Sequence, residues 1–77
     1  MATTKIVVID EVTGKRIEGV KVSLELSGGF CGPEWTDYSG EATINHTSTG
    51  KAGLYIDGNY MYDINTPGYR TVRINRY

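Results

Sequence analysis

The segment Val20-Lys21-Val22-Ser23-Leu24-Glu25-Leu26 decides the fold class of this chain of 77 residues. Apolar and polar side chains alternate along it without a break. Because successive side chains of an extended chain point to opposite faces, one face of the segment is apolar and the other is polar. The segment is therefore predicted to be a β-strand with one buried face, and a polar turn containing Gly14 precedes it.

A second segment, Thr36-Asp37-Tyr38-Ser39-Gly40-Glu41-Ala42-Thr43-Ile44, has the same construction. A polar turn with Gly40 leads into a strand predicted over residues 41–46. Ala42, Ile44 and His46 share one face of that strand because they are spaced by two. Two such units favour a small all-β domain.

Further strands are predicted on both sides of these segments. Residues 5–9 contain four consecutive β-branched side chains, which is typical of a strand covered on both faces. Residues 52–56 and 59–64 flank Asp57-Gly58, a dipeptide typical of a two-residue hairpin turn. Residues 69–77 form the last predicted strand.

The segment Ser27-Gly28-Gly29-Phe30-Cys31-Gly32-Pro33 is predicted to be irregular. Its three glycines and its proline weaken any β-ladder that they enter. A brief strand is expected after it, over residues 34–37.

Seven short strands, with turn signals about every ten residues, predict an all-β fold. We expect one domain over residues 1–77, built as a small antiparallel β-sandwich, with a small barrel as the alternative. Apolar residues do not recur with helical spacing beyond one turn, so little or no helix is expected. The first and last strands are expected to lie at sheet edges, where an unpaired strand can accept a strand from another chain.

The balance of charge argues against two classes of partner. Eight basic and nine acidic residues give a formal net charge of −1. No strong field is therefore expected to draw the chain to nucleic acid or to an anionic membrane. The nearest approaches to basic patches are interpreted as solvated strand faces. They are Lys15-Arg16 and the group Arg70, Arg73 and Arg76.

The single cysteine, Cys31, cannot close an internal disulfide, so the fold is expected to hold without one, as in a reducing compartment. The first residues lack the apolar core of a secretory signal, and no apolar run approaches the roughly 20 residues that span a bilayer. We expect a cytoplasmic protein if the chain is full-length, or else a module of a larger protein.

Three motifs in this order resemble the carboxypeptidase regulatory-like domain, a transthyretin-like β-sandwich. They are Thr13-Gly14-Lys15-Arg16-Ile17-Glu18-Gly19-Val20-Lys21-Val22, Thr36-Asp37-Tyr38-Ser39-Gly40-Glu41-Ala42-Thr43-Ile44 and Pro67-Gly68-Tyr69. The resemblance implies that Gly14 and Gly40 shape turns and that Pro67-Gly68-Tyr69 closes a strand corner. It implies no reaction, because domains of this family mostly serve as folding, docking or adhesive modules.

Few residues are available for catalysis or metal binding. His46 is the only histidine, and a structural role is favoured because residues 47–49 offer local hydrogen-bond partners. One cysteine and one histidine are too few for a zinc site, and no cofactor is expected. Loop carboxylates are possible calcium ligands, but turn formation explains them better. These carboxylates are Asp10, Glu11, Asp37 and Asp57.

Two groups of aromatic residues are the candidate binding residues. Phe30, Trp35 and Tyr38 lie in or beside the glycine-rich segment, where they either plug the open end of the sandwich or form a contact surface. Tyr55, Tyr60 and Tyr62 occupy the late hairpin, where they either stabilise the sheet as cross-strand pairs or form a self-association patch.

These observations predict a non-enzymatic module that works by surface recognition, either joining copies of itself or docking on a larger protein assembly. The first alternative is a carbohydrate-binding module that uses Trp35 and Tyr38 as a sugar platform. The second alternative is a small hydrolase that uses His46.

Overall fold

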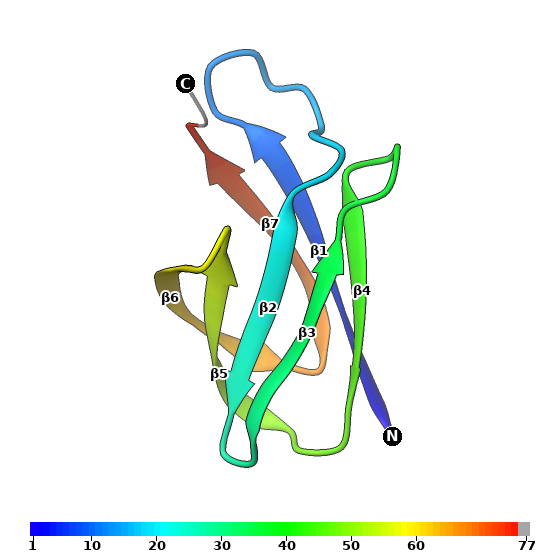
Figure 1. The fold of residues 1–77 in the computed structure, drawn as a ribbon, viewed down its shortest axis with the longest axis vertical. Coiled ribbons are helices and arrows are strands. Elements are labelled where there is room, and N and C mark those ends of the chain that lie inside the picture. Colours follow the sequence, from blue (N-terminus) through cyan, green and yellow to red (C-terminus); the bar gives the residue numbers. More distant parts are fainter. Residues whose placement is uncertain (76–77) are drawn as a thin grey trace.

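Seven strands and no helix make up the fold of residues 1–75, which are the residues that this computed structural model describes. The strands are β1 (Ala2–Asp10), β2 (Lys21–Leu26), β3 (Gly29–Trp35), β4 (Glu41–His46), β5 (Gly50–Ile56), β6 (Asn59–Thr66) and β7 (Gly68–Ile74). They form a three-stranded sheet of order β4-β1-β7 and a four-stranded sheet of order β3-β2-β5-β6 (Figure 1). The predicted small all-β sandwich is confirmed.

The core lies between the two sheets and consists of alternate residues of the strands. Leu24 and Ile44, from opposite sheets, are 0% and 1% exposed. Removing one such side chain from water stabilises the fold by about 1.5–3 kcal/mol. The apolar face predicted for residues 20–26 is confirmed, because the four apolar residues of this segment all belong to the core. The core cluster is Ile6, Val8, Val20, Val22, Leu24, Leu26, Ala42, Ile44, Ala52, Leu54, Ile56, Ile64, Val72 and Ile74.

One strand pair is parallel. β1 and β7 run in the same direction, whereas the other four pairs in the two sheets are antiparallel. Parallel neighbours cannot be joined by a short hairpin, and here β2 to β6 lie between them in the chain. The expectation of antiparallel strands is therefore wrong for this pair. It fails because β7 enters the three-stranded sheet from the other sheet, through the corner at Pro67.

The segment predicted to be irregular is a hairpin instead. Residues 27 and 28 form its turn, and β3 runs back along β2 from Gly29. The register between β2 and β3 shifts between Val22 and Leu24, and Gly32-Pro33 lies opposite this bulge. A glycine and a proline are tolerated here because β3 is an edge strand, where a missing N–H need not break a ladder.

The sheet edges differ from the expectation in one respect. β1 lies in the middle of the three-stranded sheet, so the first strand is not an edge, whereas β7 is. The central position agrees with the prediction that residues 5–9 are covered on both faces, because Ile6, Val7 and Val8 are at most 1% exposed. The end of the last predicted strand, with Arg76 and Tyr77, lies outside the described residues.

The predicted turns are present. Asp57 and Gly58 join β5 to β6 with φ angles of +52° and +84°, which are the positive values that a type I′ hairpin turn requires. Gly14 has φ +75° and its N–H donates to the Asp10 carbonyl. A Cβ on Gly40 would lie 2.6 Å from the Cβ of Arg16, so this turn also needs glycine for a close approach.

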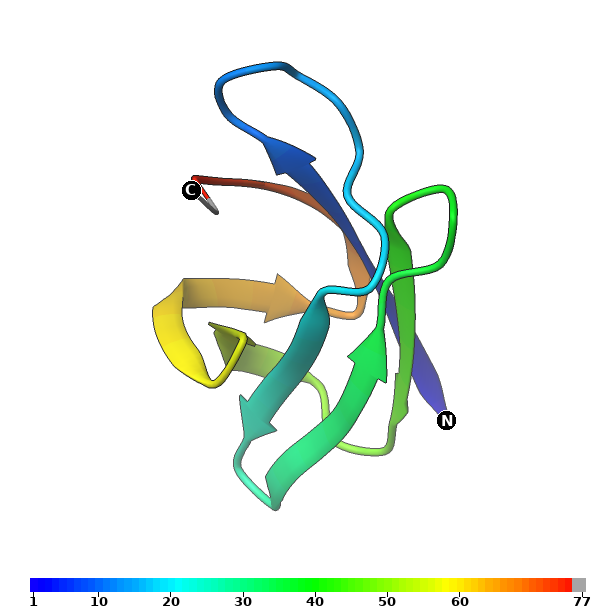
Figure 2. The same ribbon diagram turned by 45° about the horizontal axis from the view of Figure 1, so that its top comes forward.

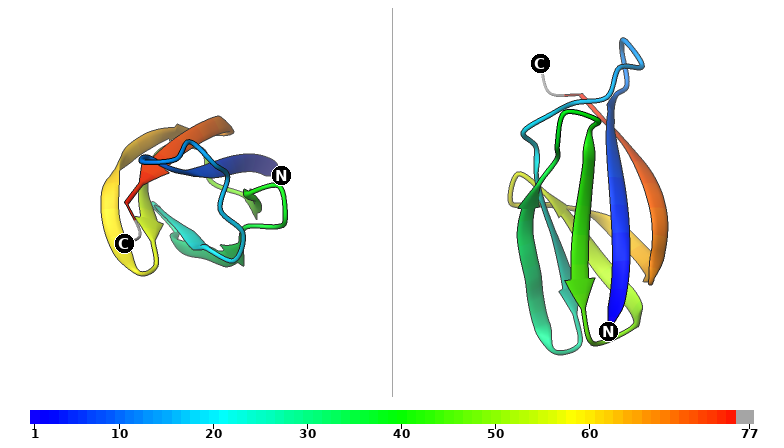
Figure 3. Two further views of the ribbon diagram at one scale, coloured as in Figure 1. Left: turned by 90° about the horizontal axis from the view of Figure 1, so that it is seen from above. Right: turned by 90° about the vertical axis from the view of Figure 1, so that its right-hand side faces the viewer.

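The two sides of the sandwich are closed differently. β3 lies beside β4, although the two strands belong to different sheets (Figure 3). On the opposite side, the guanidinium of Arg70 on β7 lies over the ring of Tyr62 on β6, 5.7 Å from its centroid. The loops after β1 and β3 lie together at one end of the molecule (Figure 2).

Candidate functional site

A bulge in β6 separates the tyrosines of the late hairpin. Tyr55 pairs with Tyr60, but Leu54 pairs with Tyr62, so Met61 is an extra residue in the ladder. Because of this extra residue, Tyr60 and Tyr62 point to opposite faces of the sheet. Tyr62 lies on the inner face of the sheet, the same face as its buried partner Leu54, and at the edge of that face because β6 is an edge strand. The hypothesis of a single tyrosine face is therefore wrong for Tyr62.

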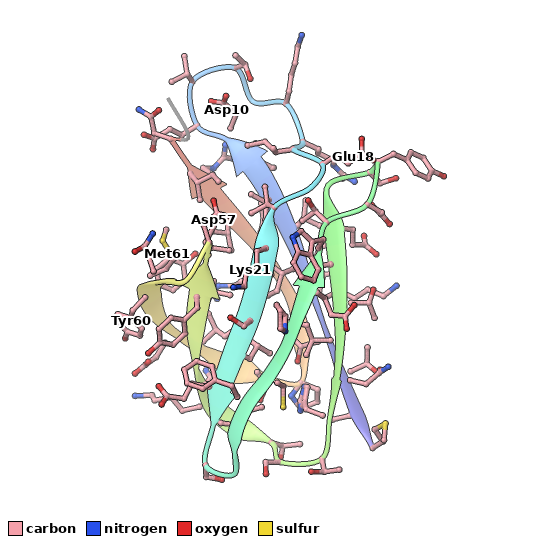
Figure 4. All side chains as sticks on the ribbon, viewed as in Figure 1. Asp10, Glu18, Lys21, Asp57, Tyr60 and Met61 are labelled. Atoms are coloured by element: carbon pink, nitrogen blue, oxygen red, sulfur yellow. The ribbon has the colours of Figure 1, made fainter. Side chains whose placement is uncertain are left out.

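Phe30, Tyr55 and Tyr60 form a continuous row on the outer face of the four-stranded sheet, which we call the aromatic row. The ring centroids of Phe30 and Tyr55 are 5.1 Å apart, and those of Tyr55 and Tyr60 are 5.6 Å apart, each pair inclined by 65°. This edge-to-face arrangement is favourable for aromatic rings. Tyr60 lies on the side of the molecule away from β4 (Figure 4). The row remains open to solvent, because Phe30 is 60% and Tyr60 54% exposed.

Two carboxylates hold the tyrosine hydroxyls of the aromatic row. Tyr55 donates to Glu25 Oε1 at 3.2 Å, and Tyr60 donates to Asp63 Oδ1 at 2.9 Å. Partial removal from water and the bond to Glu25 raise the pKa of Tyr55 above its ordinary value of 10.0. The bond to Asp63, followed by partial removal from water, raises the pKa of Tyr60 in the same way. Both phenols therefore keep their protons to a higher pH than an unperturbed tyrosine does.

The rings of Tyr55 and Tyr60 cover Gly53, which is buried although it lies on the outer face of β5. A Cβ on Gly53 would lie 3.5 Å from Cε1 of each ring and 3.6 Å from Glu25 Oε1. The missing side chain thus lets both rings lie against the sheet. Sequence reasoning missed Gly53, Glu25 and Asp63, because only the strand register places them beside the aromatic residues.

The remaining two candidate aromatic residues lie apart from the row. Trp35 ends β3 opposite Lys21 and is 58% exposed, and Tyr38 lies in the turn after β3 and is 87% exposed. Neither they nor Phe30 plug the end of the sandwich, so that interpretation is wrong. It fails because Phe30 and Trp35 pair with outward-facing residues of β2, which directs both rings outward.

His46 is part of the interior. It is 3% exposed, its Nδ1 lies 2.6 Å from the carbonyl oxygen of Ser48, and its Nε2 lies 2.7 Å from the hydroxyl of Thr4. A carbonyl only accepts, so Nδ1 carries a hydrogen, and with this tautomer the Thr4 hydroxyl donates to Nε2. Thr4 is itself 1% exposed, which leaves the pair of hydroxyl and imidazole out of reach of a substrate.

The carboxylates considered as calcium ligands include two that stabilise turns. Asp10 Oδ1 accepts from the N–H of Val12 at 2.8 Å, and Asp37 Oδ1 accepts from the N–H of Ser39 at 2.8 Å. Within the described part of the chain, no group of three His, Cys, Asp or Glu residues is arranged to hold a metal ion. Cys31 is half-buried on β3 and packs against the core. None of the described segments is a helix long and apolar enough to cross a membrane.

A shallow cleft of about 440 Å³ lies between the tip of the β5–β6 hairpin and the ends of β1 and β7. It contains none of the six candidate aromatic residues. Carboxylates, an arginine and apolar side chains all contribute to its wall, so the cleft has no single chemical character. Its lining residues are Glu11, Ile56, Asp57, Asn59, Met61, Arg73, Ile74 and Asn75.

Comparison with known proteins identifies no relative: no protein-family model matches the chain, and no curated protein matches it in sequence.

Proposed function

We propose that this chain is a non-enzymatic interaction module that binds a protein through the outer face of its four-stranded sheet. The observation that carries the proposal is the aromatic row of Phe30, Tyr55 and Tyr60, which is built and held in place yet open to solvent. Large, rigid aromatic side chains supply much of the energy of protein interfaces at a small cost in conformational entropy. The partner is a second copy or a larger protein assembly.

The same proposal assigns no reaction, cofactor, nucleic acid or membrane to the chain. It is supported by the burial of His46, the one histidine that a hydrolase could use as a base. The net charge of −1 gives no general attraction to phosphate groups. Surface recognition is the simplest use of a chain with these properties.

We further propose that the chain is a carboxypeptidase regulatory-like module of transthyretin-like fold. In support, Gly14 and Gly40 have positive φ in turns, and Pro67-Gly68 turns the chain from one sheet to the other, as the motifs imply. Modules of that family mostly serve docking or adhesion, which agrees with the proposed protein partner.

The test compares Phe30→Ala and Tyr60→Ala with Tyr69→Ala. Tyr69 is the matched control, since it is 60% exposed but lies on β7 of the other sheet. Light scattering would measure self-association of each variant. A second experiment would immobilise each variant and measure how much partner protein it retains from an extract of the host. We expect both aromatic-row variants to lose the interaction and the control to keep it. Retention by Tyr60→Ala and Phe30→Ala at the wild-type level would reject the assignment of the surface.

A carbohydrate-binding module is the second candidate, favoured by the high exposure of Trp35 and Tyr38 at one end of β3. Sugars stack on such rings. Because Trp35 is the single tryptophan, its fluorescence reports directly on binding across a panel of glycans. Quenching by a glycan that becomes weaker in the variant Tyr38→Ala would support a sugar platform. Unchanged fluorescence with every glycan would exclude it.

A further inference from the structure

Two carboxylates on the outer face of the four-stranded sheet form no ion pair among residues 1–75, although Lys51 shares this face two residues along β5 from Gly53. Glu25 and Asp63 are exposed, and the ion pair within these residues joins Lys5 to Glu41 on the other sheet. Each of the two carboxylates accepts one tyrosine hydroxyl. A carboxylate offers about four acceptor positions, so both retain most of their capacity to bind donors from solvent.

The strand register arranges these carboxylates around the aromatic row. Phe30, Glu25, Gly53 and Asp63 lie side by side across β3, β2, β5 and β6. Neighbouring strands are about 4.8 Å apart, which puts the backbones of Glu25 and Asp63 about 10 Å apart. Between them Gly53 contributes no side chain, and the rings that cover it are those of Tyr55 and Tyr60. The carboxylates therefore flank a pair of rings.

The chemistry of this surface attracts cations. The faces of aromatic rings are electron-rich and attract a cation within about 6 Å of the centroid. The neighbouring carboxylates add negative charge, and they also contribute to the raised pKa of Tyr55 and Tyr60. A guanidinium group can bind the rings and the carboxylates at once, because its plane stacks on a ring while its N–H groups form paired hydrogen bonds to a carboxylate.

We propose that this surface binds an arginine side chain of the partner protein, stacked on Tyr55 or Tyr60 and hydrogen-bonded to Glu25 or Asp63. The inference depends on the proposed function and adds the chemistry of the partner residue. The same chain already contains one such contact in its own fold, where the guanidinium of Arg70 lies over Tyr62. The outer surface offers the same ring chemistry with carboxylates in addition.

The test uses an acetylated, amidated tetraarginine peptide in a nuclear magnetic resonance titration. We expect shifts at Glu25, Gly53, Tyr55, Tyr60 and Asp63. Tetralysine should bind at least about threefold more weakly, because an ammonium cannot stack or pair in the same way. Equal affinity for tetralysine and tetraarginine would overturn the assignment of an arginine.

Charge-matched variants separate this site from general attraction. The double variant E25Q/D63N should lower the affinity for tetraarginine about tenfold, since it removes charge-assisted hydrogen bonds. E11Q/E18Q changes the net charge equally at exposed loop positions and should change the affinity less than about threefold. Equal losses in the two double variants would overturn the inference. All four substitutions are nearly isosteric and lie at exposed positions. Well-dispersed amide signals in the nuclear magnetic resonance spectra would confirm that the variants fold.

The outcome is also distinguishable from failure of the proposed function. If Phe30→Ala abolishes binding of the partner protein while E25Q/D63N leaves that binding unchanged, the interaction surface stands and the arginine inference is overturned. If E25Q/D63N abolishes binding of the partner together with that of tetraarginine, the inference is supported.

Discussion

On the outer face of the three-stranded sheet, Lys5 lies 3.5 Å from Glu41, and the neighbouring Val7 is 1% exposed. On the outer face of the four-stranded sheet, Phe30 and Tyr60 are 60% and 54% exposed. The first face buries Val7 and exposes one separate ring, that of Tyr69, whereas the second exposes the rings of Phe30 and Tyr60 in one continuous row. A thin sandwich of this kind must use both inner faces for its core, so only the outer faces are free to differ.

The contrast extends to the hydrogen bonds that hold the side chains. Tyr69, on the three-stranded sheet, is exposed but has no ring contact among the described residues. Tyr55 and Tyr60 are held by edge-to-face contacts and by carboxylates. Pre-ordered side chains lose less entropy when a partner binds, which is why we propose the four-stranded face as the interface.

The largest expected effects test whether the two inner faces are equivalent. Leu24→Ala on β2 and Ile44→Ala on β4 should each lower the free energy of unfolding by about 2–5 kcal/mol, because both side chains are fully buried in the same core. Denaturant unfolding measures both. A loss below about 1 kcal/mol for either variant would show that the two sheets do not share one core.

The next effect concerns the buried polar pair of the three-stranded sheet. Thr4→Val keeps the shape of the side chain but removes the donor to His46 Nε2, and we expect a loss of about 1–3 kcal/mol in the free energy of unfolding. Thr43→Val, at an exposed position of the same sheet, is the control and should change the stability by less than about 0.5 kcal/mol. Equal effects would contradict a structural role for this hydrogen bond.

The outer faces should differ less in stability than in binding. Phe30→Ala removes an edge-to-face contact with Tyr55 and should cost about 0.5–1.5 kcal/mol. Tyr69→Ala should lie within about 0.5 kcal/mol of the wild type. Thermal or denaturant unfolding checks both values, and a larger loss in Tyr69→Ala than in Phe30→Ala would reverse the comparison.

The smallest effect is a pH dependence of the aromatic row. The pKa of Tyr60 is raised in the folded chain, so the folded state keeps its proton above pH 10.0, where the unfolded chain loses it. This contribution to stability is fully present below pH 10.0 and is lost as the pH rises through the folded pKa. Asp63→Asn should lower the pKa of Tyr60, as ultraviolet titration of tyrosinate can show. An unchanged titration curve would contradict the hydrogen bond to Asp63.

Local sequence signals identified most of the fold. The alternation in residues 20–26 and 41–46, and the Asp57-Gly58 turn, depend on neighbours in the chain, and all three were correctly assigned. The hairpin formed by β2 and β3 was not, because the tolerance of Gly32 and Pro33 depends on the position of β3 at a sheet edge. Edge position is a property of the whole fold, and no local signal encodes it.

In the candidate site, too, some features follow from the local sequence and others only from the whole fold. The six aromatic residues were identifiable as unusual, but their grouping depends on the β6 bulge at Met61, which turns Tyr62 away from Tyr60. The carboxylates Glu25 and Asp63 join the site only through the register of β2, β5 and β6.

The amino-acid order alone determined that this chain forms strands with one apolar face, because the direction of each side chain in an extended chain follows from its position in the sequence. Only the tertiary structure decided which strands lie at edges, which pair is parallel and which rings meet on one surface. Those properties come from contacts between residues far apart in the chain, whose geometry is set when the two sheets close on their common core.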